Sequence, residues 1–109
     1  MKSKHVLLFL LFLIIGQKII AQNNFFVLKI KVLDQKTNLE IKKAEIYFNK
    51  INKKIFTDKY GMTTIALPIG EQPFQITNEE YETLNGNLLL SSDSSITFFL
   101  NPLSMGLSI

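Results

Sequence analysis

The sequence contains no cysteine and only one histidine, His5, which lies near the N-terminus. The rest of the chain therefore lacks both imidazole and thiol groups. Serine–histidine and cysteine–histidine catalysis depends on these groups, and the usual zinc sites use them as ligands. We therefore expect a protein that is not an enzyme and that carries no metal and no cofactor. A minimal hydrolase is the alternative from another class, but the missing histidine and the short chain argue against it.

Arginine is absent as well, so that all 12 basic residues are lysines. Three of them, Lys2, Lys4 and Lys18, lie in the N-terminal segment and account for the net charge of +3. The other lysines are equal in number to the 9 aspartates and glutamates. Because the rest of the chain is neutral overall and offers no arginine beside aromatic rings, we expect no nucleic-acid partner.

The lack of cysteine also excludes disulfide bonds and a lipid-attachment cysteine behind a leader. Small exported domains often depend on disulfides because their cores are small. A chain of 109 residues has room for one domain. That domain has to fold on apolar burial and sheet hydrogen bonds alone.

The first 21 residues have the pattern of a secretory signal peptide. Two lysines give a positive start, residues 6–15 are an unbroken apolar run, and Ala21 offers a small residue for cleavage. An uncleaved membrane anchor is the alternative, but a spanning helix needs about 20 apolar residues and Lys18 interrupts the run. We predict a signal peptide over residues 1–21 and no stable membrane span after cleavage. The mature protein would be periplasmic, outer-membrane-associated or extracellular.

Behind this segment, apolar and polar residues alternate in short runs, which is the period of a strand with one buried face. The first run places Leu28, Ile30 and Val32 on one face and lysines on the other. Many short strands without a helical period predict an all-β fold over residues 22–102, a seven-stranded antiparallel Greek-key sandwich of the immunoglobulin-like kind. The inward positions expected in the later strands are Ala44, Ile46, Phe48, Thr63, Ile65, Leu67, Phe74, Ile76, Ile96, Phe98 and Leu100.

Five turn residues separate these runs. Asp34 and Asp58 are expected to cap turns, because a short carboxylate accepts hydrogen bonds from nearby turn amides. Gly61 would close the Asp58 turn in a left-handed conformation. Pro68 and Gly70 would break the chain between two strands. The alternative is that the two aspartates bind calcium. A calcium loop, however, has several oxygen ligands within a few residues, and two separate carboxylates do not show that pattern.

One further turn signal has two interpretations. Asn85 and Gly86 lie within residues 81–90. The pair is typical of a tight hairpin turn, and it also fits a bulge within one longer strand. The sequence leaves both open.

The last seven residues show strand periodicity. Leu103, Met105, Leu107 and Ile109 are apolar and alternate with small or polar residues. An apolar strand at the end of a chain is exposed unless something covers it, whereas most chain ends simply fray. We therefore keep two interpretations of residues 103–109: a loosely packed tail, or a strand that adds to the sheet of a partner.

Two groups of side chains could bind a ligand. Three glutamates cluster within residues 79–82, and we interpret them as a solvated acidic turn, because paired acid–base chemistry needs a sheltered cleft. Tyr47, Tyr60 and Tyr81 could form one face on which a sugar stacks. Tyrosines more often pack half-buried with the hydroxyl in water.

The order of these turn and core residues resembles the carboxypeptidase-regulatory-like domain, a transthyretin-like sandwich. The resemblance extends over residues 28–100 and implies a fold but no ligand, because its motifs are turn and core signals. Domains of this kind occur at the N-terminus of TonB-dependent outer-membrane receptors, attached to carboxypeptidases, and as separate exported modules. The matching residues are Val32 to Asp34, Ala44 to Ile46, Thr57, Asp58, Gly61, Leu67, Pro68, Gly70 and Tyr81.

The sequence therefore predicts an exported, non-catalytic β-sandwich that acts as an interaction or accessory module of the cell envelope. By the resemblance it would be a stand-alone or truncated N-terminal domain of a TonB-dependent receptor. Its partner would be an envelope protein, contacted through a sheet edge, a loop or residues 103–109. The alternative is a secreted glycan-binding or surface-binding adhesion domain.

Overall fold

The computed structural model describes residues 24–103. The predicted signal peptide lies outside the described residues, and so does the predicted partner strand except for Leu103. No helix long and apolar enough to span a bilayer occurs within the described range. The seven strands are β1 (Phe25–Asp34), β2 (Glu45–Phe48), β3 (Lys53–Phe56), β4 (Met62–Pro68), β5 (Gly70–Asn78), β6 (Tyr81–Leu90) and β7 (Ser94–Leu100).

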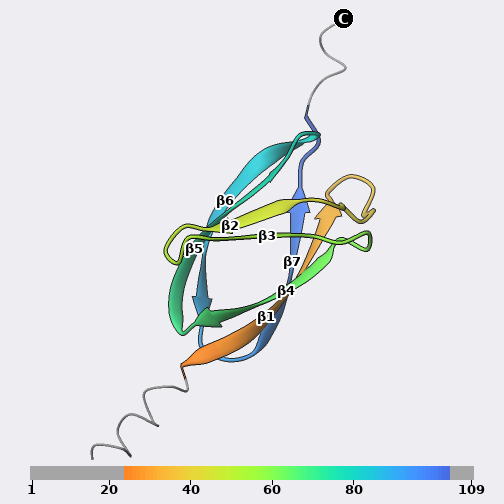
Figure 1. Cartoon of the computed structure of the whole chain (residues 1–109). Helices are drawn as coiled ribbons and strands as arrows, with labels where there is room; N and C mark the ends of the chain where they lie inside the picture. The colour runs from red at the N-terminus through yellow and green to blue at the C-terminus, as the bar shows by residue number, and fades with distance from the viewer. Residues whose placement is uncertain (1–23, 104–109) are drawn as a thin grey trace, which may run out of the picture.

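The strands form two sheets that face one another (Figure 1). One sheet has three strands in the order β4-β1-β7, and the other has four in the order β3-β2-β5-β6. The chain changes sheet after β1, β3, β4 and β6. The predicted all-β sandwich of seven strands is thus confirmed.

One strand pair differs from the predicted antiparallel arrangement. β1 and β7 run parallel, with Leu28 opposite Ser94 and Asp34 opposite Leu100. Only strands joined by a tight hairpin are forced to be antiparallel. β7 is reached from β6 in the other sheet, so that it enters beside the start of β1 and runs in the same direction.

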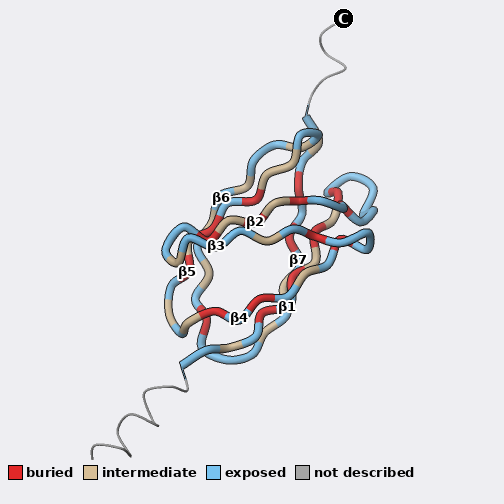
Figure 2. Tube along the Cα trace, in the orientation of Figure 1, coloured by how far each residue is buried: buried red, intermediate tan, exposed pale blue. Residues whose placement is uncertain are grey.

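The alternating residues form the core between the sheets. Leu28, Ile30 and Val32 of β1 are buried, as are most of the predicted inward positions in the other strands. Figure 2 shows the buried residues in red along the strands. Thr63 and Ile96 are only half-buried.

Three phenylalanine rings connect the two layers. Phe74 of β5 lies 4.8 Å from Phe98 of β7 and 6.5 Å from Phe48 of β2, measured between ring centroids, and both pairs are tilted. Tilted aromatic pairs at these separations are attractive beyond the apolar area they bury. The Phe74–Phe98 pair therefore joins the four-stranded sheet to the three-stranded one.

Asn85 and Gly86 do not form a turn. Both lie in the interior of β6, paired with Gln75 and Phe74 of β5. The register shift of this pair of strands lies elsewhere, between the pairs Ile76–Leu84 and Asn78–Tyr81. The hairpin interpretation is therefore wrong, and the alternative of one longer strand is right, although its bulge does not lie at Asn85 and Gly86.

Gly86 is needed for packing instead. A Cβ atom at Gly86 would lie 2.5 Å from Cζ of Phe74, which is closer than real contacts allow. The missing side chain leaves room for the ring that connects the two layers. The actual β5–β6 turn lies at residues 78–81, where Oδ1 of Asn78 accepts a hydrogen bond of 2.9 Å from the Glu80 amide.

The strand directions define two ends of the sandwich (Figure 1). The entry end contains the start of β1 and the β2–β3, β4–β5 and β6–β7 connections. The exit end contains the β1–β2, β3–β4 and β5–β6 connections and the end of β7. The described chain therefore enters the fold at one end and leaves it at the other.

Candidate functional site

The exit end brings together three of the predicted turn residues, Asp34, Asp58 and Gly61. The Val32 amide donates a hydrogen bond of 2.8 Å to the Gly61 carbonyl, which joins the β3–β4 turn to the end of β1. Gly61 has a φ of 71°, and a Cβ there would lie 2.7 Å from the Val32 carbonyl oxygen. The turn therefore packs against β1 so closely that only glycine fits.

The carboxylate of Asp58 is occupied by its own turn. Its Oδ1 accepts hydrogen bonds from the amides of Tyr60 at 2.8 Å and Met62 at 3.0 Å. The Gly61 amide donates to the Asp58 carbonyl at 2.9 Å, which closes the turn. These bonds hold the turn against the end of β1 and leave Asp58 a structural role.

Thr57 connects the same turn to the β1–β2 loop. Its hydroxyl donates to the Ile41 carbonyl at 2.7 Å and accepts from the Ala44 amide at 2.9 Å. Only 4% of Thr57 is exposed, and no local pattern around this residue predicts that its hydroxyl is buried. One side chain thus satisfies two buried backbone groups of a loop that lies at least 13 positions away along the chain.

Asp34 and Tyr81 form the main polar pair of the exit end. The Tyr81 hydroxyl donates to Oδ2 of Asp34 at 2.8 Å, across a separation of 47 positions in the sequence. The other oxygen, Oδ1, accepts from the amides of Lys36 at 2.7 Å and Thr37 at 3.1 Å. Both carboxylate oxygens of Asp34 therefore have donors, and Tyr81 ties the start of β6 to the end of β1.

This pair shifts both ionisation equilibria. The hydrogen bond from Tyr81 lowers the pKa of Asp34 below its ordinary value, against an opposing effect of burial, and the Thr37 and Lys36 amides lower it further. Burial, followed by the hydrogen bond to Asp34, raises the pKa of Tyr81 to about 12. The folded state therefore favours a charged Asp34 and a neutral Tyr81.

The stability of the protein is expected to depend on pH through this pair. The pKa of Asp34 is lower in the folded protein than in the unfolded chain, so its carboxylate stabilises the fold at every pH above the unfolded pKa. This stabilisation is lost as the pH falls through the folded pKa. The raised pKa of Tyr81 contributes stability below about pH 10, its unfolded value, and this contribution is lost as the pH rises towards about 12. Tyr81→Phe should therefore be less stable than wild type at neutral pH, and the difference should narrow in acid and in strong base.

Urea denaturation of both proteins between pH 3 and pH 11 would measure this difference. In an Asp34→Asn background, the stability lost through Tyr81→Phe should be the same in acid as at neutral pH, because no carboxylate is left to protonate at position 34. Parallel stability curves for wild type and Tyr81→Phe over the whole range would contradict the role of the pair.

The end of β7 leaves the fold along the start of β6. The Glu82 amide donates to the Asn101 carbonyl at 2.8 Å, and the Leu103 amide donates to the Glu80 carbonyl at 3.1 Å. Between them, Tyr81 and Pro102 form an antiparallel bridge. Residues 101–103 thus extend β7 beyond its own sheet and pair with the edge of the other one.

The glutamates of the β5–β6 turn do not form an acid–base pair. Glu79 and Glu80 are exposed, and together with Glu40, Lys42 and Lys43 they line a shallow hollow of about 320 Å³ at the exit end. Within residues 24–103, no group of three or more His, Cys, Asp or Glu side chains could hold a metal ion. This surface is polar and of mixed charge.

Pro68 and Gly70 lie at the entry end, away from the other turn residues. Pro68 is the last residue of β4 and Gly70 the first of β5, with a φ of 110° at Gly70. The Pro68 carbonyl accepts a hydrogen bond of 3.0 Å from Nε2 of Gln72, which is only 1% exposed. These residues therefore make a corner between the two sheets.

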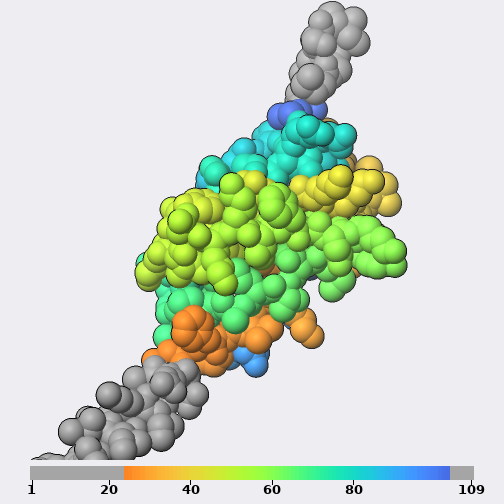
Figure 3. All heavy atoms as spheres, viewed as in Figure 1, coloured from red at the N-terminus to blue at the C-terminus, as the bar shows by residue number. Residues whose placement is uncertain are grey.

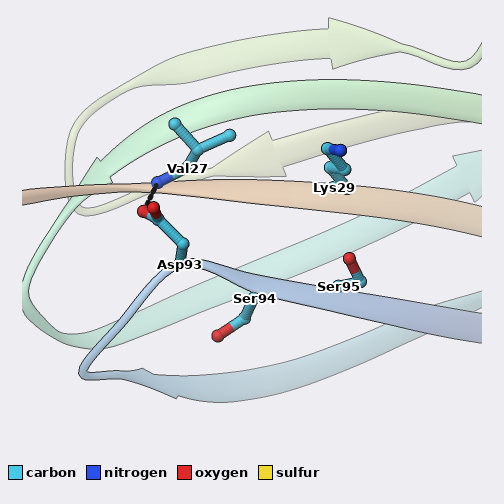
Figure 4. A pocket seen from close by; sticks show the side chains of 5 residues that line it. All are labelled: Val27, Lys29, Asp93, Ser94 and Ser95. Atoms are coloured by element: carbon cyan, nitrogen blue, oxygen red, sulfur yellow. Dashed lines mark hydrogen bonds between the residues drawn. The ribbon is translucent and has the colours of Figure 1, made fainter.

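A second hollow, of about 430 Å³, lies at the entry end beside the starts of β1 and β7 (Figure 4). Oδ1 of Asp93 accepts a hydrogen bond of 2.8 Å from the Val27 amide, before β7 begins to pair with β1. Figure 4 shows Ser94 and Ser95 on opposite sides of the β7 ribbon. Residues 24–103 contain no histidine, so the described part of the chain offers neither hydroxyl an imidazole as a base.

The three tyrosines do not form one face, contrary to the expectation of a shared stacking surface. Tyr60 lies on the exposed β3–β4 turn, with the Lys59 ammonium 5.1 Å from its ring. Tyr81 lies at the start of β6 and is bonded to Asp34. Tyr47 lies in the middle of the four-stranded sheet, on β2, where its hydroxyl donates to Oδ1 of Asn52 at 2.9 Å.

No family model matches the sequence, and no curated protein matches it. Several solved structures do match. Among them, 3-chlorocatechol 1,2-dioxygenase from Rhodococcus opacus has a TM-score of 0.61 at 14% identity, over 73% of this chain and 61% of the enzyme. A DUF3823 family protein from Parabacteroides merdae has a TM-score of 0.55 at 16% identity, over 72% of this chain and 47% of that protein.

The major pilin subunit BcpA of Bacillus cereus also matches, with a TM-score of 0.53 at 15% identity, over 70% of this chain and 30% of the pilin. The chain thus spans less than two thirds of each of these proteins. One is an enzyme and another a pilin, so the similarity concerns the fold and not the activity. These matches support a β-sandwich, whereas the carboxypeptidase-regulatory-like assignment stays a prediction.

Proposed function

We propose that this chain is an exported, non-catalytic β-sandwich that acts as an interaction module of the cell envelope. The signal-peptide pattern of residues 1–21, the sandwich over residues 24–103 and the lack of histidine and cysteine in that range support the proposal. The resemblance of the turn motifs to the carboxypeptidase-regulatory-like domain extends it to outer-membrane uptake systems, where such domains stand at the start of TonB-dependent receptors.

The main support for an interaction role comes from the backbone hydrogen bonds at the end of the described chain. Backbone pairing with the start of β6 continues through Asn101 to Leu103. The apolar alternation of the sequence begins at Leu103 and continues through Met105, Leu107 and Ile109. We propose that this segment adds as a strand to the sheet of a protein partner, a mode in which main-chain hydrogen bonds give affinity and alternate side chains give specificity.

Removing residues 104–109 is expected to reduce capture of an envelope partner by about tenfold or more, which corresponds to about 1.4 kcal/mol of binding free energy. The comparison uses quantitative mass spectrometry of proteins captured from envelope extract by the full chain and by the shortened chain. The shortened chain should unfold at nearly the same temperature, because it keeps the whole described sandwich. Unchanged capture would reject the proposal.

Single substitutions test whether the contact has the periodicity of a strand. Aspartate at Met105 or Leu107 should reproduce the loss of capture, whereas aspartate at Ser104 or Ser108 should have a much smaller effect. Equal effects on both faces would contradict strand addition, since a strand presents alternate residues to its partner.

A further inference from the structure

The outer face of the four-stranded sheet carries polar side chains in register across all four strands. Tyr47 on β2 is paired with Lys54 on β3 and with Gln75 on β5, and Gln75 is paired with Asn85 on β6. Side chains of directly paired residues lie on the same face of a sheet. Lys54, Tyr47, Gln75 and Asn85 therefore form one row, here called the Tyr47 row, that is roughly 14 Å long at about 4.8 Å per strand.

The row borders a hollow of about 340 Å³ that is lined by Glu45, Tyr47, Asn52, Lys54 and Gln75. The hydrogen bond from Tyr47 to Asn52 fixes the tyrosine ring relative to the β2–β3 turn, where Asn52 has a φ of 53°. This hairpin, coloured yellow to light green, lies at the surface in the middle of Figure 3. The hollow therefore combines one held aromatic ring with two carboxamide groups.

The charges of the hollow compensate one another. The Lys54 ammonium lies 3.7 Å from the Glu45 carboxylate, and no other charged residue lines the hollow. A nucleic acid or an acidic glycan would need cations without such partners. The face therefore suits a ligand that is polar and neutral.

We infer that the Tyr47 row binds a neutral oligosaccharide. Sugar hydroxyls both donate and accept hydrogen bonds, and the carboxamides of Gln75, Asn85 and Asn52 do the same. The Tyr47 ring adds an apolar surface with a polar tip, against which the C–H face of a pyranose can pack. A row across four strands matches an extended chain of sugar units better than a single small molecule.

This site is separate from the proposed partner strand. The row lies on the outer face of the four-stranded sheet, whereas the partner strand follows Leu103 at the exit end. Removal of residues 104–109 should therefore leave sugar binding intact, and Tyr47→Ala should leave partner capture intact. Failure of one hypothesis is in this way distinguishable from failure of the other.

The test uses the processed full chain on an array of neutral and acidic oligosaccharides, followed by calorimetry with cellohexaose, maltohexaose and chitohexaose. We expect binding to at least one of these neutral probes. Tyr47→Ala and Gln75→Ala should each weaken it by about tenfold or more, and Tyr47→Phe should weaken it less because the ring remains. Tyr60→Ala is the matched control on another element and should bind like wild type.

Circular dichroism and thermal unfolding of each variant exclude a loss caused by misfolding. Three results would overturn the inference: no binding to any neutral probe, binding only to acidic glycans, or neutral binding that survives Tyr47→Ala unchanged.

Discussion

Replacement of Gly61 by alanine is expected to destabilise the sandwich by about 2–5 kcal/mol. Two costs add at this position. A residue with a Cβ atom resists the φ of 71°, which costs about 1–2 kcal/mol. The new Cβ would also lie 2.7 Å from the Val32 carbonyl oxygen and 3.1 Å from the Ile41 amide nitrogen, and overpacking costs about 1–3 kcal/mol more.

The clash is with backbone atoms, which explains why it cannot be relieved cheaply. The Val32 carbonyl accepts a hydrogen bond of 3.0 Å from the Ile41 amide, and the Val32 amide donates to Gly61 itself. Moving the turn away from β1 would therefore break the contacts that hold the exit end together. We expect the loss to appear in urea denaturation as a lower midpoint with an unchanged slope.

Gly70→Ala is the matched control. Gly70 also has a positive φ, of 110°, but apart from Gly70 and its two chain neighbours no residue has an atom within 4 Å of the position that its Cβ would take. The substitution should cost only the backbone strain, about 1–2 kcal/mol. If both variants lost the same free energy of unfolding, the close approach of the turn to β1 would not contribute to the effect of Gly61→Ala.

Thr57→Val is expected to destabilise the protein by about 2–4 kcal/mol. Valine has nearly the same shape as threonine but has no hydroxyl, so that the Ile41 carbonyl and the Ala44 amide both lose their partner. A buried polar group without a partner costs about 1–3 kcal/mol. Thermal or urea unfolding of the purified variant measures the effect.

Thr57→Ser distinguishes the contribution of the hydroxyl to stability from that of the methyl group. Serine keeps both hydrogen bonds and removes one methyl, which should cost about 1 kcal/mol. If serine were as damaging as valine, the packing of the methyl group and not the hydrogen bonds would explain the effect. If valine were as stable as wild type, the two backbone groups would have found other partners.

These two sites matter for function because both lie at the exit end. Gly61 fixes the β3–β4 turn against β1, and Thr57 fixes the β1–β2 loop against the same turn. Asp34 then holds Tyr81, beside which residues 101–103 leave the fold. The direction in which the proposed partner strand leaves the sandwich therefore depends on a connected set of turns.

The alternating residues of β1 and β2 were sufficient to predict strands and their buried faces. Leu28, Ile30, Val32, Ile46 and Phe48 are all buried as expected. Such predictions succeed because the two-residue period of a strand is a local property, and one face of a sandwich strand has to be buried. A turn such as the one at Asp58 is local for the same reason, since its hydrogen bonds span at most 4 positions.

The position of the β5–β6 turn was not predicted from the sequence. Asn85 and Gly86 have the composition of a tight turn, yet the chain turns earlier, at Asn78. Local propensity is a weak constraint when a ring from a neighbouring strand needs the space of a glycine. Because the position of this turn sets the register between β5 and β6, the pairing of Gln75 with Asn85 could not be predicted either.

The sequence by itself therefore determined the class of fold, the buried face of most strands and the turns around Asp58 and Pro68. Only the tertiary structure decided that β1 and β7 run parallel, that Tyr81 bonds to Asp34, and that Tyr47 lies in a row with side chains of three other strands. The physical reason is distance along the chain. Periodicity and turn chemistry act over a few residues, whereas these contacts join segments that meet only when both sheets have formed.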